Sequence, residues 1–130
     1  MICQVDASLK NNKSSHSFVI KNKDGKILYK KAFKGFETRS TEAELNSIIK
    51  ALQFINKKNL RKVTIITDCL SIVEAVNKDK SEKIDVSYLK FLLKSTRTNI
   101  TWIPREYNVY SDSLCRNINK PKIKKGLLIK

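Results

Sequence analysis

The chain has 130 residues, 41% of them hydrophobic, which fits one folded domain with one core and excludes an intrinsically disordered chain. No apolar stretch approaches the length of a membrane span, so we expect no membrane partner. Lys and Arg number 27 against 12 Asp and Glu, a formal net charge of +15. This excess indicates a polyanionic partner such as nucleic acid, although the base composition of a genome can produce the same Lys bias.

The cysteines and the first residues indicate an intracellular, cytoplasmic protein. Cys3, Cys69 and Cys115 are widely spaced, without the paired spacing of zinc sites or disulfide frameworks. The opening segment lacks the basic stretch and the long apolar run of a signal peptide. We also expect a monomer that needs no organic cofactor.

The first third of the chain predicts three antiparallel strands. Residues 2–7 read as a strand, residues 8–15 as a polar turn rich in Asn, Ser and Lys, and residues 16–20 as a second strand. Asp24-Gly25 is a turn signal, and residues 27–33 continue as a third strand. The sheet is therefore expected to open with an antiparallel meander.

The rest of the chain predicts helices between two further strands. Apolar residues recur at helical spacing after Ser40 and Thr41, which are candidate N-caps. The expected elements are a helix over 41–56, a buried parallel strand over 63–67, helices over 70–77 and 86–95, a strand over 99–103 and a helix over 111–117. This order predicts an α/β fold with a five-stranded mixed sheet, three antiparallel strands followed by parallel strands, and helices on both faces. We place the domain at residues 1–119, followed by a basic tail over 120–130.

Four carboxylates lie within or beside apolar runs, namely Asp6, Glu44, Asp68 and Asp112. A buried ionised carboxylate is costly without partners, and a shared divalent metal would remove that cost. Three of the four have simpler explanations, since Glu44 could complete a capping box with Thr41, and Asp68 and Asp112 could cap the helices that follow them. Asp6 lies inside an apolar strand, where no such explanation applies.

The four acids belong to longer motifs, which are Val5-Asp6-Ala7-Ser8, Thr41-Glu42-Ala43-Glu44-Leu45, Ile66-Thr67-Asp68-Cys69 and Trp102-Ile103-Pro104-Arg105-Glu106-Tyr107-Asn108-Val109-Tyr110-Ser111-Asp112-Ser113-Leu114. These motifs resemble those of the ribonuclease H family, and most closely its short, reverse-transcriptase-like branch. The resemblance covers residues 2–117. It implies that the four acids are catalytic ligands of two Mg²⁺ or Mn²⁺ ions. It also implies hydrolysis of the RNA strand of RNA/DNA hybrids, leaving 5′-phosphate and 3′-hydroxyl ends.

The same resemblance implies residues that contact the hybrid. They are Ser8, Asn11 and Asn12 after the first strand, Arg39, Ser40 and Thr41 before Glu44, and Arg105 and Asn108 near the metal site. Strand choice would depend on 2′-hydroxyl contacts across the minor groove. The simpler explanation for Arg105 and the Lys-rich surface around it is solvation.

The chain departs from the family pattern at three motifs. It has Asp6-Ala7-Ser8 in place of Asp-Gly-Ser, no glycine-rich turn after the first strand, and Asp68-Cys69 in place of Asp-Ser. Its only histidine, His16, does not occupy the position of the histidine that helps product leave in many relatives, and we interpret it as an ordinary strand residue. The alternative function is therefore a catalytically weak or inactive ribonuclease H-like nucleic-acid-binding protein. A different nuclease on the same fold and a structural protein of an RNA-rich assembly are further hypotheses.

Overall fold

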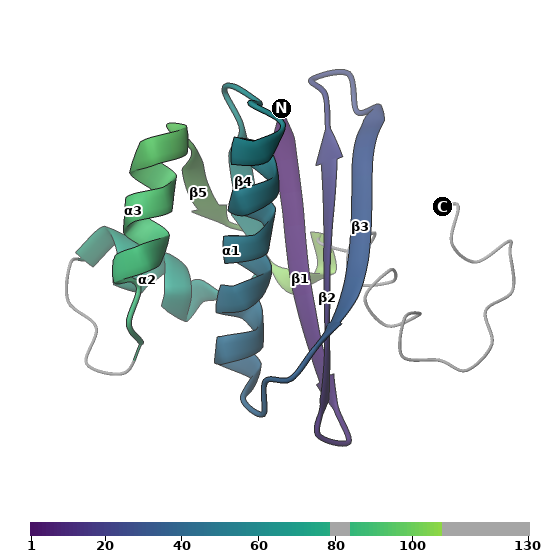
Figure 1. Ribbon diagram of the computed structural model, residues 1–130, viewed down its shortest axis with the longest axis vertical. Coiled ribbons are helices and arrows are strands. Elements are labelled where there is room, and N and C mark those ends of the chain that lie inside the picture. Colours follow the sequence, from purple (N-terminus) through teal and green to yellow (C-terminus); the bar gives the residue numbers. More distant parts are fainter. Residues whose placement is uncertain (79–83, 108–130) are drawn as a thin grey trace, which may run out of the picture.

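Five strands form one mixed sheet in the computed structural model, which describes residues 1–78 and 84–107 (Figure 1). The strands are β1 (Ile2–Lys10), β2 (Lys13–Lys21), β3 (Ile27–Gly35), β4 (Thr64–Thr67) and β5 (Asn99–Trp102). Their order across the sheet is β3-β2-β1-β4-β5. The β1–β2 and β2–β3 pairs are antiparallel, whereas β1–β4 and β4–β5 are parallel. The predicted five-stranded mixed sheet is confirmed, with β4 as an interior parallel strand.

The turn between β1 and β2 is much shorter than predicted. Only Asn11 and Asn12 separate the strands, and both have positive φ, 53° and 60°. A two-residue hairpin turn of type I′ needs positive φ at both positions, and Asn tolerates that conformation better than most residues. Ser8 therefore pairs with Ser15 inside the sheet, so the prediction of a turn over residues 8–15 was wrong.

Within residues 1–78 and 84–107, three helices and one short 3-10 turn accompany the sheet. The helices are α1 (Ser40–Lys57), α2 (Leu70–Lys78) and α3 (Ser87–Thr96), and the 3-10 turn is η1 (Arg105–Tyr107). Figure 1 shows α1 lying across one face of the sheet over β1, with α3 beside it. The helix predicted over 111–117, which would lie after β5, and the tail over 120–130 fall outside the described residues.

The core lies between α1 and the sheet. Ile48, Leu52 and Ile55 of α1 are fully buried, as are Val5 of β1 and Ile65 of β4. Each fully buried aliphatic side chain contributes roughly 1.5–3 kcal/mol relative to an exposed one, so this layer fixes α1 against β1 and β4. None of the described helices combines the length and the hydropathy needed to cross a bilayer.

Candidate metal centre

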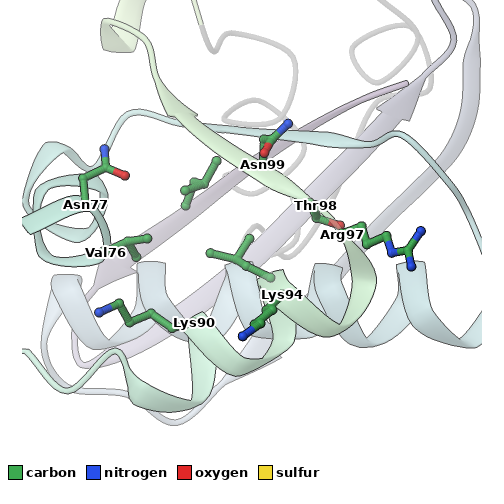
Figure 2. A pocket seen from close by; sticks show the side chains of 9 residues that line it. Val76, Asn77, Lys90, Lys94, Arg97, Thr98 and Asn99 are labelled. Carbon is green, nitrogen blue, oxygen red and sulfur yellow. The ribbon is translucent and has the colours of Figure 1, made fainter. Parts of the chain in front are cut away.

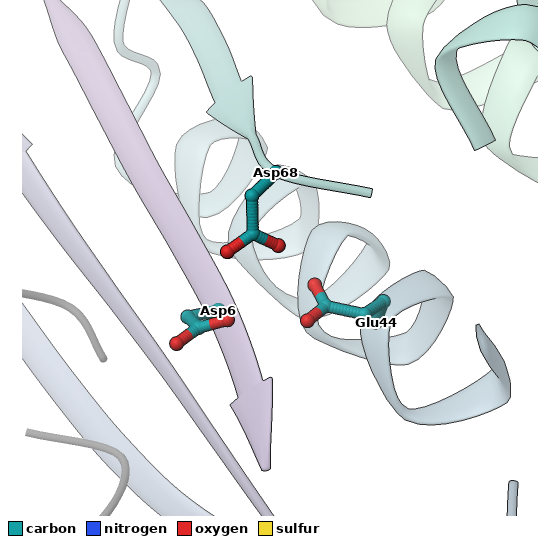
Figure 3. Close-up of side chains that lie close together, drawn as sticks. All are labelled: Asp6, Glu44 and Asp68. Carbon is teal, nitrogen blue, oxygen red and sulfur yellow. The ribbon is translucent and has the colours of Figure 1, made fainter. Parts of the chain in front are cut away.

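The structure brings three of the four predicted carboxylates together. Asp6 lies on β1, Glu44 on the second turn of α1, and Asp68 directly after β4 (Figure 3). One oxygen from each side chain lies within 4.8 Å of the others. Asp6 is 1% exposed and Glu44 is 9% exposed, so two of the acids are buried. Asp112 lies outside the described residues.

The parallel pairing of β1 and β4 explains how residues far apart in sequence meet. Gln4 of β1 pairs with Ile66 of β4, so Asp6 and Asp68 each come two residues after paired positions. Both strands run in the same direction, so Asp6, halfway along β1, lies level with Asp68, which follows the carboxyl end of the shorter β4. The buried face of α1 places Glu44 against these two residues.

Glu44 does not act as a helix cap. The helix begins at Ser40, with Arg39 at the N-cap position and no side-chain hydrogen bond at that cap. The Glu44 Oε1 atom instead accepts a hydrogen bond from the backbone N–H of Ala7, at 3.2 Å. The capping-box explanation for Glu44 is thus wrong, as is the prediction that Ser40 or Thr41 caps the helix. The Glu44 carboxylate is directed at β1.

The burial and charge around Glu44 suit the binding of a cation. Burial, and after it repulsion from Asp68, raise the pKa of Glu44 from 4.5 to about 8, although hydrogen bonds with Asp6 and the Ala7 amide oppose the rise. Its Oε2 atom is buried and accepts no hydrogen bond from the described part of the chain. A divalent cation would remove this repulsion, and an all-oxygen donor set suits Mg²⁺ or Mn²⁺. The residues present therefore fit a divalent metal site.

Trp102 is a neighbour of the site that sequence reasoning missed. Its Nε1–H donates a hydrogen bond to the Asp68 backbone carbonyl, at 3.1 Å. The Cys69 N–H donates to Thr67 Oγ1 at 3.1 Å, so the backbone is held on both sides of the Asp68 side chain. Thr67 pairs with Trp102 across β4 and β5. A signal was available, because two parallel strands that end side by side bring their last residues together.

The predicted nucleic-acid contacts occupy three places. Ser8 lies near the end of β1, and Asn11 and Asn12 are exposed at the hairpin turn. Arg39, Ser40 and Thr41 line a cavity of about 540 Å³ at the start of α1. Arg105 is exposed in η1, and Asn108 lies outside the described residues.

A second cavity, of about 490 Å³, lies between α2, α3 and the first residues of β5. Lys90, Lys94 and Arg97 line it together with Val76. Figure 2 shows the charged ends of these three basic side chains pointing in different directions. They do not converge on one ligand, and we call this basic surface the comparison surface.

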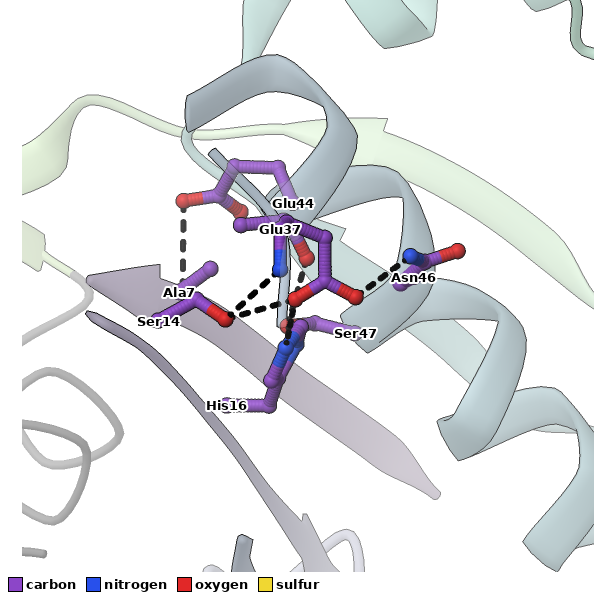
Figure 4. Close-up of polar contacts among 8 residues, drawn as sticks. Ala7, Ser14, His16, Glu37, Glu44, Asn46 and Ser47 are labelled. Atoms are coloured by element: carbon purple, nitrogen blue, oxygen red, sulfur yellow. Dashed lines mark hydrogen bonds and ion pairs between the residues drawn. The ribbon is translucent and has the colours of Figure 1, made fainter. Parts of the chain in front are cut away.

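A partly buried polar cluster connects β2, α1 and the segment between β3 and α1 (Figure 4). We call it the Glu37 cluster; its members are Ser14, His16, Glu37, Asn46 and Ser47. Burial alone would raise the pKa of Glu37, but hydrogen bonds from Ser14, Asn46, its own backbone and His16 outweigh it and lower the pKa to about 2. The Glu37 carboxylate is therefore ionised over the whole neutral range.

Glu37→Gln is expected to lower the free energy of unfolding at pH 7 by about 2–3 kcal/mol. A lowered carboxyl pKa contributes stability above the ordinary pKa of 4.5, and this stability is lost as the pH falls from about 4.5 to about 2. Urea unfolding followed by circular dichroism at pH 7 and pH 3 measures the effect. The difference between wild type and variant should shrink at pH 3, and an equal difference at both pH values would contradict the assignment.

Comparison with known proteins places this chain in a family. The sequence model of one family, described as reverse transcriptase-like, matches residues 4–118. No curated protein sequence matches the chain.

Solved structures match the fold at low sequence identity. Ribonuclease H1 from the halophilic archaeon Halobacterium salinarum NRC-1 is 16% identical, with a TM-score of 0.77, and the match covers 89% of this chain and 94% of that one. LC11-RNase H1 in complex with an RNA/DNA hybrid is 22% identical, with the same TM-score and the same coverage. The N-terminal RNase H domain of rv2228c from Mycobacterium tuberculosis, as a fusion with maltose binding protein, is 19% identical, with a TM-score of 0.75 and coverage of 89% and 90%. The fold is that of ribonuclease H.

Proposed function

We propose that this chain, which belongs to the reverse transcriptase-like family of ribonuclease H proteins, is a metal-dependent nuclease that hydrolyses the RNA strand of RNA/DNA hybrids. One observation carries the proposal. Asp6, Glu44 and Asp68 come from three separate elements and place a carboxylate oxygen each within 4.8 Å of the others. Such a cluster is unfavourable while all three carboxylates are ionised, and a bound cation would allow all three to stay ionised at neutral pH.

The proposed metal ligands are Asp6, Glu44 and Asp68, with Asp112 as the fourth on the resemblance alone. Asp6, the most deeply buried of the three described acids, would hold the metal from the middle strand of the sheet. When bound, two Mg²⁺ or Mn²⁺ ions would supply an activated water at neutral pH and stabilise charge on the attacking and leaving oxygens of the phosphodiester. The protein itself holds the carboxylates in place: the Ala7 N–H fixes Glu44, and Trp102 fixes the backbone at Asp68.

Substrate contacts are proposed on the surface around this centre. Arg39 is exposed at the start of α1, next to the cavity that Ser40 and Thr41 also line. A guanidinium can bind phosphate through two hydrogen bonds, and the high net positive charge of the chain favours sequence-independent attraction of the backbone. We propose these residues, together with Ser8, Asn11, Asn12, Arg105 and Asn108, as contacts with the hybrid. A monomeric state and an intracellular location belong to the same proposal.

Arg39→Ala is expected to weaken hybrid binding by roughly tenfold and to lower the salt dependence of binding by about one phosphate contact. Lys94→Ala is the matched control, because Lys94 is an exposed cation on the comparison surface. Fluorescence anisotropy in EDTA, at several salt concentrations, measures binding without cleavage. Equal losses in the two variants would mean that only net charge matters, which would contradict a specific role for Arg39.

The substrate class is tested by comparing four labelled substrates of one sequence: an RNA/DNA hybrid, duplex RNA, single-stranded RNA and duplex DNA. With Mg²⁺ or Mn²⁺ we expect cutting of the RNA strand of the hybrid and little cutting of the others. Preferred cutting of another substrate would identify a different nuclease on this fold.

A catalytically weak hybrid-binding protein is the second candidate function. The departures from the family motif near Asp6 are the observation that favours it. However, Ala7 is a strand residue paired with His16, and its φ is outside the positive region that favours glycine. The backbone therefore does not require glycine at position 7. Tight, salt-sensitive binding of the hybrid without cutting would support this second candidate.

A further inference from the structure

Glu37 lies between β3 and α1, and its carboxylate joins three parts of the chain. Its Oε1 atom accepts hydrogen bonds from Ser14 Oγ at 2.6 Å and from His16 Nε2 at 2.7 Å. Its Oε2 atom accepts one from Asn46 Nδ2 at 2.6 Å. The Glu37 N–H also donates to Ser14 Oγ, at 3.2 Å. The segment that leads into α1 is thus anchored to β2 and to α1 itself.

His16 extends the cluster to the inner face of α1. The side chain is fully buried, and its ring stacks on Phe33 with centroids 5.1 Å apart. An ionised carboxylate only accepts hydrogen bonds, so His16 Nε2 carries a hydrogen and donates it to the hydrogen bond with Glu37. The other ring nitrogen, Nδ1, lies 2.6 Å from Ser47 Oγ. His16 therefore connects Glu37 to α1 through the interior.

Two residues that pair across β1 and β2 each contact α1. Ala7 pairs with His16 across β1 and β2. The Ala7 N–H contacts Glu44, and His16 contacts Ser47, three residues later on α1. Residues three apart share one face of a helix. These two contacts reach the same face of α1, and together they fix the rotation of the helix about its axis and its distance from the sheet near Glu44.

We propose that the Glu37 cluster positions Glu44 for metal binding, with His16 and Glu37 as positioning residues. This inference rests on the proposed function, because Glu44 is assigned there as a metal ligand. Without the cluster, the first two turns of α1 lose their anchors on β2 and on the segment before the helix. The Glu44 carboxylate would then be free to move away from Asp6 and Asp68. Groups hydrogen-bonded to a metal ligand change metal affinity by about 10–100-fold, and the Glu37 cluster acts one step further from Glu44, so we expect an effect at the lower end of this range.

Gly35 offers an independent way to disturb the cluster. A Cβ atom at this position would collide with Glu37 Oε1, His16 Nε2 and Ser14 Oγ. Gly35→Ala therefore displaces the cluster while every polar group in it remains. Glu37→Gln removes the charge and keeps the shape. Two chemically different changes should then produce the same loss at the metal site.

The test is direct Mn²⁺ binding, measured by electron paramagnetic resonance or calorimetry on wild type, Glu37→Gln, Gly35→Ala and Ile55→Ala. Ile55 is buried in the last turn of α1, far along the helix from Glu44, so this control loses stability without touching the cluster. We expect both cluster variants to bind Mn²⁺ about tenfold more weakly than wild type, and Ile55→Ala to bind as wild type does. All measurements are made where circular dichroism shows each variant folded.

The outcomes separate this inference from the proposed function. If wild type does not bind Mn²⁺, the proposed function is wrong. If wild type binds Mn²⁺ and Glu37→Gln binds it within twofold of wild type, the positioning role is wrong and the proposed function stands. An equal loss in Ile55→Ala would also overturn the positioning role, because general destabilisation would then explain the effect.

Discussion

Asp6→Asn is expected to reduce metal-dependent cleavage of an RNA/DNA hybrid by about 10³-fold or more. Asp6 is buried in the middle strand of the sheet, between β2 and β4, and it belongs to the three-carboxylate cluster. Asn keeps the shape of the side chain and removes the negative charge that a divalent cation needs. Initial rates on an end-labelled hybrid, at saturating Mg²⁺ and Mn²⁺, measure the loss.

The matched control for this change is Asp24→Asn. Asp24 is exposed in the turn between β2 and β3, so the same chemical change there should leave cleavage unaltered. Binding of the hybrid in EDTA should remain close to wild type in both variants, because each substitution leaves every Lys and Arg side chain that could bind phosphate in place. Cleavage by Asp6→Asn within tenfold of wild type would exclude Asp6 as a metal ligand.

Glu44→Gln is expected to stabilise the metal-free protein at alkaline pH and to reduce strongly its stabilisation by metal. The pKa of Glu44 is raised from 4.5 to about 8 by burial and then by Asp68. A raised carboxyl pKa means that the folded state keeps a proton that the unfolded state has lost. Wild type without metal therefore loses stability as the pH rises from about 4.5 to about 8, whereas the Gln variant avoids the contribution of this group. We expect a gain of roughly 2–4 kcal/mol at pH 9.

Urea unfolding in EDTA and in excess Mn²⁺ measures both effects. At pH 8 and 100 times the dissociation constant, Mn²⁺ should stabilise wild type by about 3 kcal/mol and the Gln variant by much less. A loss of function that accompanies a gain in stability is typical of residues kept for chemistry. If Glu44→Gln destabilises the metal-free protein at pH 9, the carboxylate is held by contacts that make metal unnecessary.

The sequence predicted the fold well because its local signals agree with its tertiary pairing. The helical spacing of Ile48, Leu52 and Ile55 predicts α1, and the core confirms it. The β-branched residues before Asp68 predict a parallel interior strand, and β4 pairs on both sides. The largest boundary error lies between the first two strands: polar composition predicted a turn at residues 8–15, but β-ladder pairing extends both strands to the two-residue turn at Asn11 and Asn12.

The site was predictable in part, for a similar reason. Asp6 in an apolar strand is unusual enough to indicate function from the residue alone, and the structure places it beside Glu44 and Asp68. His16 and Glu37 were not predictable as a pair, because no spacing connects a strand histidine with an acid 21 residues later. Their contact depends on the register of β2 against β3, which only the folded sheet defines.

The most direct test of the central claim uses an end-labelled RNA/DNA hybrid with wild type and Asp68→Asn, in Mg²⁺, Mn²⁺ or EDTA. We expect wild type to cut only the RNA strand, to need a divalent metal, and to lose this cutting in EDTA and in Asp68→Asn. Cutting that persists in EDTA, or that is equal in Asp68→Asn, would contradict the assignment of the carboxylate cluster as the catalytic metal centre.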